Sequence, residues 1–281
     1  MKIENCKLKI TRKGAIGVFD SGFGGLDVLK HIVKKLPQYD YIYLGDTARA
    51  PYGERSQEVI FSFTKQAVEF LFAQGCPLVI LACNTASSEA LRKIQKEYLA
   101  IKFPDNRVLG VLIPMAQEAT EKNRSKIGVI GTSGTVASFG FIKEIKKINP
   151  KAKVFQKACP LLVPIVEAGE EKSQIANLAL TSYLKYFKNK KIQALILGCT
   201  HYGLLKAKIK KIIGKDVVVI SSGYVTAKKL KSYLNNHPEM EKRISKTKTI
   251  LFYSTDITDK FQKLGTRFFN KPIKPKKVSL E

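Results

Sequence analysis

Short apolar segments alternate with longer amphipathic segments along nearly the whole chain, and this alternation limits the fold more than any other feature. The apolar segments are rich in Val and Ile, which predicts strands. We expect strands at residues 15–19, 41–44, 78–82, 107–112, 126–130, 194–197, 217–220 and 249–253, with a weaker candidate at 153–157. Strands without polar alternation are buried on both faces, as in parallel sheets that helices cover.

The segments between these strands show helical periodicity. Residues 56–73 carry Val59, Phe63, Ala67 and Phe70 at spacings of three and four, and residues 85–98, 172–187 and 225–235 behave similarly. A regular alternation of strand and helix predicts an α/β fold. The 281 residues are enough for one large domain or two smaller ones.

The charge balance is strongly basic, with 49 Lys and Arg against 23 Asp and Glu and a net charge of +26. A nucleic-acid or anionic-membrane partner would explain it, and so would solvated helix faces in a lysine-rich protein. The basic residues are scattered in pairs such as Lys34 and Lys35, without interleaved aromatic residues for base stacking. We therefore expect no specific nucleic-acid partner and only weak, salt-sensitive binding to polyanions.

The cysteines indicate a reducing compartment. Cys6, Cys76, Cys83, Cys159 and Cys199 are odd in number, widely spaced and free of a C-x-x-C pair. Neither a zinc site nor a disulfide framework is therefore expected. The first residues lack the apolar run of a signal peptide, and no apolar stretch approaches the ~18 residues of a membrane span. We expect a soluble cytoplasmic protein without a membrane partner.

Two loops that follow predicted strands have the composition of binding sites. In residues 20–25, DSGFGG, the glycines allow close approach of a ligand, and the helix that follows could bind an anion at its N-terminus. A turn in which Asp20 caps the helix is the alternative. Residues 45–53, GDTARAPYG, place a carboxylate, a guanidinium and a phenol in one loop. A binding loop and a capping loop are equally compatible with that composition.

Cys83 and Cys199 each end a predicted strand. A thiol at a helix N-terminus, as expected for Cys83, has its thiolate form favoured by the helix dipole. His201 lies two residues after Cys199 and could polarise that thiol or hold its proton. Each cysteine alone could equally be a small core residue. The segments LVILACNT (78–85) and ALILGCTH (194–201) nevertheless resemble one another.

A pair of such cysteines suits the inversion of a carbon stereocentre. One thiolate would remove the α-proton, and the other thiol would return a proton to the opposite face. The ordinary thiol pKa of ~8.5 is close to a physiological operating pH, as general acid/base catalysis requires. No cofactor is indicated, since a pyridoxal phosphate enzyme needs one particular Lys and this lysine-rich chain singles none out.

Six motifs in order resemble those of bacterial glutamate racemases. They span residues 16–205 and read DSGFGGLDVL, YLGDTARAPYG, LACNTAS, KIGVIGTSGTVAS, CPLLVPIVEAGE and LILGCTHYGLL. Residues 250–269 also resemble the C-terminal strand and helix of that family. The resemblance implies a cytosolic racemase that needs no pyridoxal phosphate, commonly forms dimers and supplies D-glutamate for peptidoglycan.

The same resemblance implies an architecture. Two doubly wound parallel-sheet α/β domains would face each other across an active-site cleft. Residues 14–106 with 221–270 would form the first domain, and residues 107–220 the second. Residues 1–13 and 271–281 would be peripheral tails.

The resemblance also implies the roles of individual residues. Cys83 and Cys199 would be the catalytic pair, with Asp20 assisting near the first and His201 near the second. No metal or cofactor is implied. Substrate contacts would come from Asp20, Ser21, Pro51, Tyr52, Gly53, Asn84, Thr85, Thr132, Thr200 and His201. His201 favours glutamate as the substrate, because the related aspartate racemases typically carry Glu at that position.

Three positions depart from the family pattern. Ile113 stands where the family usually has a Glu, Ser221 where it often has an Asp, and Gly203 where a Pro is usual. The lost carboxylate and the basic charge leave two alternatives open. One is a polyanion-binding or regulatory protein on a degenerate racemase scaffold, and the other is a racemase of a different acidic amino acid.

Overall fold

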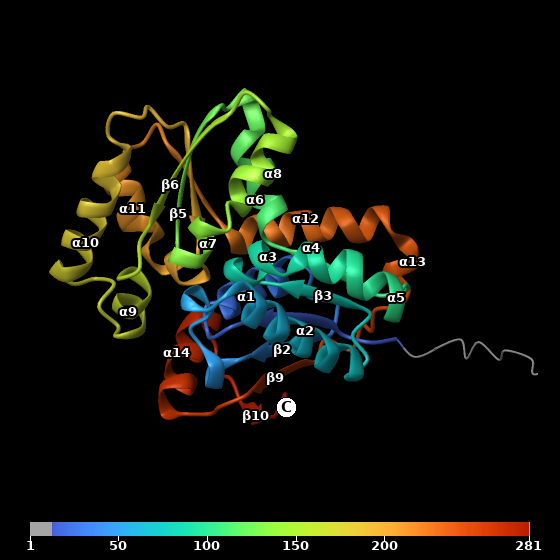
Figure 1. Ribbon diagram of the computed structural model, residues 1–281. Coiled ribbons are helices and arrows are strands. Elements are labelled where there is room, and N and C mark those ends of the chain that lie inside the picture. The colour runs from blue at the N-terminus through green and yellow to red at the C-terminus, as the bar shows by residue number, and fades with distance from the viewer. Residues whose placement is uncertain (1–12, 281) are drawn as a thin grey trace, which may run out of the picture.

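Two parallel β-sheets organise the computed structural model, which describes residues 13–280 (Figure 1). The six-stranded sheet has the order β10-β9-β2-β1-β3-β4, and the four-stranded sheet has the order β6-β5-β7-β8. Every strand pair in both sheets is parallel. The predicted α/β fold with two parallel-sheet domains is confirmed. Cys6 and nearly all of the expected N-terminal tail lie outside the described residues.

The strands are β1 Ile16–Asp20, β2 Tyr41–Gly45, β3 Leu78–Leu81, β4 Arg107–Gly110, β5 Lys126–Gly131, β6 Lys153–Ala158, β7 Ala194–Gly198, β8 Val218–Ser221, β9 Ile250–Ser254 and β10 Pro275–Lys277. The α-helices are α1 Gly25–Lys35, α2 Gln57–Ala73, α3 Asn84–Glu89, α4 Leu91–Lys93, α5 Ala100–Lys102, α6 Leu112–Thr120, α7 Ser133–Ala137, α8 Gly140–Ile148, α9 Leu162–Glu167, α10 Gln174–Leu184, α11 Lys206–Ile213, α12 Ser222–Asn236, α13 Pro238–Glu241 and α14 Asp259–Phe269. Short 3-10 segments are η1 Thr47–Arg49, η2 Tyr52–Glu54, η4 Glu121–Asn123, η5 Lys185–Phe187 and η6 Thr200–Leu205, and η3 Ile94–Leu99 is a π-helix.

The nine predicted strands are all present, each within one or two residues of its expected ends. The helix expected at residues 85–98 is instead broken into α3, α4 and the π-helix η3. The helix expected at 56–73 begins one residue later, because the Ser56 hydroxyl caps α2 by accepting from the Val59 N–H at 3.4 Å. The strand β10 was not predicted, and it lies in the segment expected to be a peripheral tail.

Each sheet reverses its strand order at one point, and the catalytic candidates lie at those points. The chain passes from β1 to β2 on one side and then to β3 on the other side of β1. In the second sheet it passes from β5 to β6 and then returns to β7. At such a reversal the loops that follow two neighbouring strands run to opposite sides of the sheet and leave a crevice between them. Open α/β sheets bind ligands in that crevice. Asp20 is the last residue of β1, Cys83 follows β3, and Cys199 follows β7.

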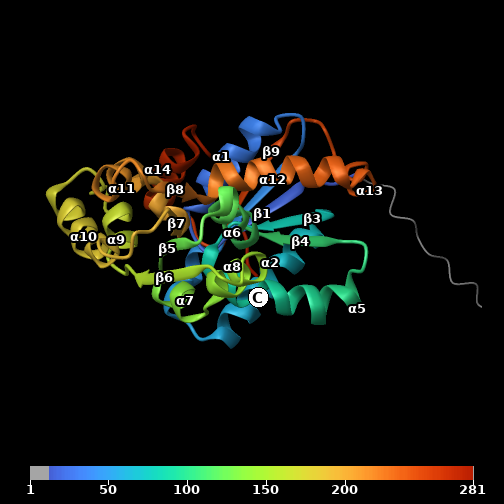
Figure 2. The same cartoon turned by 90° about the horizontal axis from the view of Figure 1, so that it is seen from above.

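The domain assignment remains a prediction, but the sheets differ from its bounds, most clearly at residue 107. Strand β4 pairs with β3 in the six-stranded sheet, although residue 107 was expected to begin the second domain. Two connections that begin at helices α6 and α12 join the sheets. In Figure 2, α12 lies across the six-stranded sheet near α1. None of the described helices is long and apolar enough to cross a membrane.

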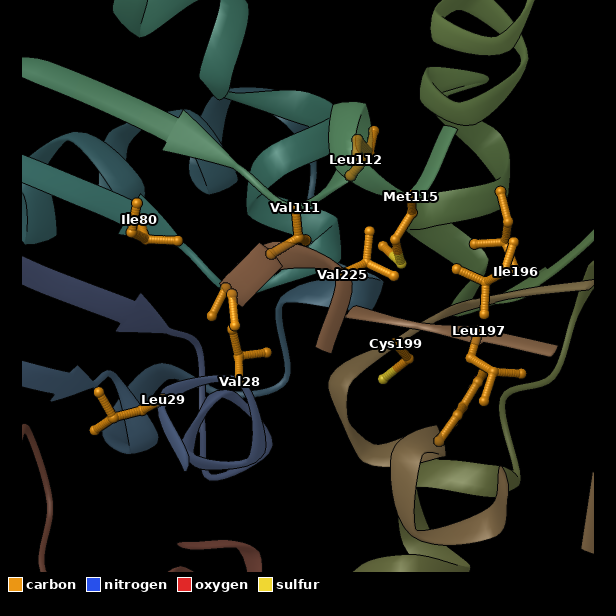
Figure 3. Close-up of a cluster of buried hydrophobic side chains, with 14 of the residues drawn as sticks. Val28, Leu29, Ile80, Val111, Leu112, Met115, Ile196, Leu197, Cys199 and Val225 are labelled. Carbon is orange, nitrogen blue, oxygen red and sulfur yellow. The ribbon is translucent and has the colours of Figure 1, made fainter. Parts of the chain in front are cut away.

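One hydrophobic core extends through both sheets. It contains Leu29 of α1, Met115 of α6 and Leu197 of β7, all fully buried, together with Val225 of α12. Figure 3 shows these side chains with Cys199 at the edge of the same cluster. The two domains are therefore packed together rather than joined only by their connections.

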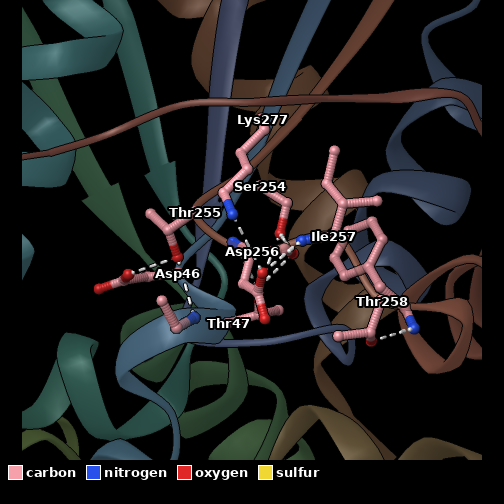
Figure 4. A network of polar contacts seen from close by, with 10 residues as sticks. Asp46, Thr47, Ser254, Thr255, Asp256, Ile257, Thr258 and Lys277 are labelled. Atoms are coloured by element: carbon pink, nitrogen blue, oxygen red, sulfur yellow. Dashed lines mark hydrogen bonds and ion pairs between the residues drawn. The ribbon is translucent and has the colours of Figure 1, made fainter.

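A polar network fixes the loop after β2. The buried carboxylate of Asp46 accepts hydrogen bonds from the Thr255 hydroxyl at 2.9 Å and from the Tyr52 hydroxyl at 2.5 Å. Thr47 donates to the Asp256 carbonyl oxygen at 2.8 Å, so the loop is bound to the end of β9 (Figure 4). Strand β9 lies beside β2, which brings these residues together.

The turn after β1 packs directly on the turn after β7. Gly24 has φ −61° and ψ −30°, a conformation that any residue adopts, so its need for glycine is one of space. A Cβ on Gly24 would lie 2.2 Å from Thr200 Oγ1 and 2.9 Å from His201 Nδ1. This close approach brings the loop that carries Asp20 against the loop that carries Cys199.

We predict that Gly24→Ala lowers the free energy of unfolding by about 1–3 kcal/mol, as overpacking of a close contact does. Gly22→Ala is the control, since its Cβ would meet only Asp20 Oδ2, at 4.0 Å. Urea titrations of the two variants measure the difference. Equal stability of both variants would contradict the packing argument.

Candidate active site

Two adjacent cavities lie between the sheets. The inner cavity has a volume of about 50 Å³ and contains both Cys83 and Cys199. The outer one is a vestibule of about 590 Å³. Both are lined by Pro51, Gly53 and Thr132, so the vestibule adjoins the inner cavity. Of the residues that the sequence indicates, the inner cavity is lined by Ser21, Pro51, Tyr52, Gly53, Cys83, Asn84, Thr85, Thr132, Cys199, Thr200 and His201.

Cys83 occupies the N-cap position of α3, directly after β3. Its sulfur accepts from the Ala86 N–H at 3.5 Å and lies 3.3 Å from the Ser21 hydroxyl. Burial first, and the carboxylate of Asp20 second, raise the pKa of the Cys83 thiol to about 12. The thiol form is therefore favoured at neutral pH while the cavity holds no ligand.

Asp20 lies behind the cavity wall at the end of β1 and is the one predicted site residue outside the lining. Its carboxylate accepts from the Gly22 N–H at 2.9 Å and from the Thr200 hydroxyl at 3.4 Å. Burial raises the pKa of Asp20, and the charge of His201 opposes that rise. The carboxyl group is thus buried between the Cys83 side and the Cys199 side, and it contacts a residue from each sheet's loops.

His201 links Cys199 to an acidic partner. Its Nδ1 lies 3.8 Å from the Cys199 sulfur, and its Nε2 lies 3.2 Å from Oε1 of Glu167. Burial lowers the pKa of His201, but its hydrogen bonds to Cys199 and Glu167 raise it more, to about 10. The imidazole is therefore protonated at neutral pH and can donate hydrogen bonds on both sides.

Neutral hydrogen-bonding groups complete the inner cavity, which has no Lys or Arg among the described residues that line it. Asn84 is 2% exposed, and neither its amide nitrogen nor its amide oxygen has a hydrogen-bond partner. The Thr85 hydroxyl lies 3.2 Å from the hydroxyls of Thr132 and Thr135. A buried amide without a partner is costly, about 1–3 kcal/mol, unless a ligand satisfies it. The arrangement therefore suits an anionic ligand that is bound by uncharged donors.

Tyr52 lines the cavity with its ring, but its hydroxyl donates to Asp46. Burial raises the pKa of Tyr52, and the Asp46 carboxylate raises it further, so the phenol stays protonated. A Cβ on the next residue, Gly53, would lie 2.8 Å from Thr132 Cβ. Asp46 therefore fixes the loop after β2 through the Tyr52 hydroxyl, and the same loop packs closely on the start of α7.

Glu167 is the site residue that sequence reasoning missed. It lines both cavities and contacts His201, yet a single Glu at the end of a short apolar helix has no distinctive pattern. The only signal was its place within the motif CPLLVPIVEAGE.

The departures from the family pattern lie outside the lining of both cavities. Ile113 lines a separate cavity of about 230 Å³ between β4, α6 and α12. Ser221 accepts from the Lys206 ammonium group at 3.3 Å, and Gly203 faces the carboxylate of Asp27. The missing carboxylate at residue 113 therefore removes no side chain from the cysteine cavity.

Comparison with known proteins gives consistent matches over most of the chain. Residues 16–230 match the Asp/Glu/hydantoin racemase family. A glutamate racemase from Geobacter metallireducens is 41% identical over 255 residues, which cover 90% of this chain and 92% of that protein. The crystal structure of Francisella tularensis glutamate racemase in complex with D-glutamate is similar, with a TM-score of 0.86, 38% identity, and coverage of 96% of this chain and 98% of that one. The Bacillus anthracis glutamate racemase structure has a TM-score of 0.87 at 35% identity and covers 95% of this chain and 98% of that one.

We predict that His201 makes stability depend on pH. A histidine whose pKa is raised by folding from its ordinary value of 6.5 to about 10 stabilises the folded state when protonated. Its contribution is complete below pH ~6.5 and is lost as the pH rises through about 10. The difference in unfolding free energy between the wild type and His201→Asn should therefore shrink over that range in urea titrations. A constant difference would contradict the raised pKa.

Proposed function

The chain belongs to the Asp/Glu/hydantoin racemase family, and on that premise we propose that it interconverts L- and D-glutamate with Cys83 and Cys199 as its two acid/base groups. The observation that carries the proposal is the inner cavity, which is lined by thiols from loops of different sheets. Each thiol also has its own ionisable neighbours, Asp20 on one side and His201 with Glu167 on the other. Relatives about 40% identical are glutamate racemases, and one neighbouring structure holds D-glutamate.

The proposed reaction is a proton transfer in two steps. One cysteine, as thiolate, takes the proton from Cα, and the electron pair of the broken C–H bond passes into the adjacent carboxylate. The other cysteine, as thiol, then gives its proton to the opposite face of Cα. One sulfur has gained a proton and the other has lost one, so the pair must exchange protons with its neighbours before the next turnover in the same direction. His201 and Asp20 are placed to hold those protons.

The substrate itself would activate Cys83. Burial and the nearby Asp20 carboxylate hold this thiol in its protonated form. The α-ammonium group of an amino acid near Asp20 would offset both effects and favour the thiolate. We assign the Asn84 amide to a substrate carboxylate, because it is buried, faces the cavity and has no partner.

The inner cavity is smaller than the ~300–1,000 Å³ of typical ligand sites, whereas the vestibule falls within that range. Glutamate would therefore enter through the vestibule, and its binding would require the two sheets to separate slightly. We further propose, from the resemblance of the motifs, that the enzyme is a cytoplasmic homodimer whose D-glutamate serves peptidoglycan synthesis.

We predict that dialysed protein exchanges the α-proton of L-glutamate in D2O and racemises it without added pyridoxal phosphate or metal. Proton NMR follows the exchange, and polarimetry follows the racemisation. L-Aspartate in parallel tests the choice of substrate. No exchange with glutamate would overturn the proposal, and faster exchange with aspartate would reassign the substrate.

Cys83→Ala and Cys199→Ala should each abolish racemisation, because either change leaves one face of Cα without an acid or base. Cys76→Ala is the control, because Cys76 is equally buried but lines neither cavity. Wild-type racemisation in either of the first two variants would rule out the two-cysteine mechanism.

Asn84→Ala should raise the KM for glutamate at least tenfold, a loss of ~1.4 kcal/mol of binding, without lowering the free energy of unfolding. Stability is retained because the amide has no partner in the ligand-free protein. Thr226→Val is a matched control, since that buried hydroxyl also lacks a partner but lies in the cavity beside Ile113. A KM unchanged in Asn84→Ala would remove Asn84 from the binding site.

A further inference from the structure

The imidazole of His201 is contacted from the opposite domain. Phe268, on α14, is fully buried, and its ring meets the His201 ring edge-on, with 5.3 Å between centroids and 77° between planes. Helix α14 follows β9 of the six-stranded sheet, whereas His201 follows β7 of the four-stranded sheet. Figure 1 shows α14 beneath the end of the second domain, near α9.

The residue before Phe268 makes a second contact across the same junction. Arg267 forms an ion pair with Glu171, whose side chain is 15% exposed. The Arg267 guanidinium also lies 3.6 Å from the position that a Cβ on Gly169 would take. Both contacted residues follow directly after α9, which ends at Glu167. Helix α14 therefore contacts His201 itself and the segment that carries the acidic partner of His201.

Helix α14 is firmly attached to its own domain. Phe261 packs on Phe23, with 5.3 Å between ring centroids, and Phe269 packs edge-on against Phe252 of β9, also at 5.3 Å. The Thr258 hydroxyl caps the helix by accepting from the Phe261 N–H at 3.1 Å. The helix thus presents to the second domain a surface that is anchored in the six-stranded sheet's domain.

We propose that Phe268 and Arg267 are positioning residues, through which α14 holds the His201 imidazole between Cys199 and Glu167. The edge of the Phe268 ring restricts rotation of the imidazole, and the Arg267–Glu171 ion pair holds the end of α9 in place. Opening of the domains would release both contacts, so His201 would be aligned only in the closed enzyme. The kinetic consequence rests on the proposed racemase function, whereas the placement of the imidazole does not.

Histidine NMR tests the placement without substrate. The chain contains only three histidines, so the His201 ring signals can be assigned by comparison with His201→Asn. The titratable groups that face this imidazole are Cys199, Glu167 and Asp20, and Phe268 adds no charge. In Phe268→Leu the hydrogen bonds that raise the pKa of His201 should loosen, and its pKa should fall by at least half a unit.

Phe269→Leu is the matched control, because Phe269 lies on the same helical turn, is 7% exposed and contacts Phe252 instead of His201. It should leave the titration of His201 unchanged. Arg267→Met, at a partly exposed position, should lower the pKa of His201 in the same direction. The exchanged pair Arg267→Glu with Glu171→Arg should restore the wild-type titration. An unchanged pKa in both Phe268→Leu and Arg267→Met, or an equal fall in Phe269→Leu, would overturn the proposal.

Kinetics supply a second readout. In Phe268→Leu the kcat should fall about tenfold while the KM stays within twofold, and Phe269→Leu should match the wild type. The α-deuterium isotope effect should rise for one enantiomer only, the one that Cys199 deprotonates. If the NMR shift is found but the wild type does not racemise glutamate, the proposed function fails and the positioning inference stands. If the wild type is active and Phe268→Leu leaves both the NMR titration and the isotope effects unchanged, the positioning inference fails.

Discussion

The close approach between the turn after β1 and the turn after β7 is the constraint on which the rest of the site depends. Any Cβ at residue 24 would clash with Thr200 and His201 in their present positions. The same approach lets the Thr200 hydroxyl reach the Asp20 carboxylate. Each sheet has its own reversal of strand order, and this contact helps to bring the two resulting crevices together into one cavity.

Burial in that cavity shifts the pKa of Cys83 upward and the pKa of His201 downward, and the neighbours of each group decide its final protonation state. On the Cys83 side, burial and the nearby Asp20 both disfavour the charged form, so the thiol keeps its proton. On the other side, burial disfavours the charged imidazole, yet Glu167 and Cys199 outweigh it and His201 keeps its proton too. The ligand-free site therefore has a proton on each side, which is the state that an amino-acid substrate with its α-ammonium group would meet on binding.

The sequence predicts elements whose signal is local and misses those that depend on distant partners. Apolar runs predict all nine of the longer strands, with β6 as the weakest candidate, whereas β10, with Pro275 and two lysines, lacks the composition of a strand and exists because β9 pairs with it. The helical spacing of residues 85–98 could not reveal that the chain adopts a π-helix there. The link between Asp46 and Thr255 joins residues 209 apart in sequence and requires that β2 lie beside β9. Cys83 and Cys199 were identifiable because each ends a strand, while Glu167 is recognisable as a site residue only once His201 is placed beside it.

The shared core restricts how such a site can open. Leu29, Met115 and Leu197 belong to one buried cluster, so separating the domains completely would expose apolar surface from both at ~25 cal/mol per Å². A rotation about that core would leave most of its contacts in place. Such a rotation would open the side of the molecule that contains the vestibule. On that side the domains meet through polar and aromatic contacts such as Arg267–Glu171 and Phe268–His201. On the proposed mechanism, the contacts that hold His201 would therefore separate when the substrate enters and re-form before the chemistry, which would couple the alignment of His201 to closure over the substrate.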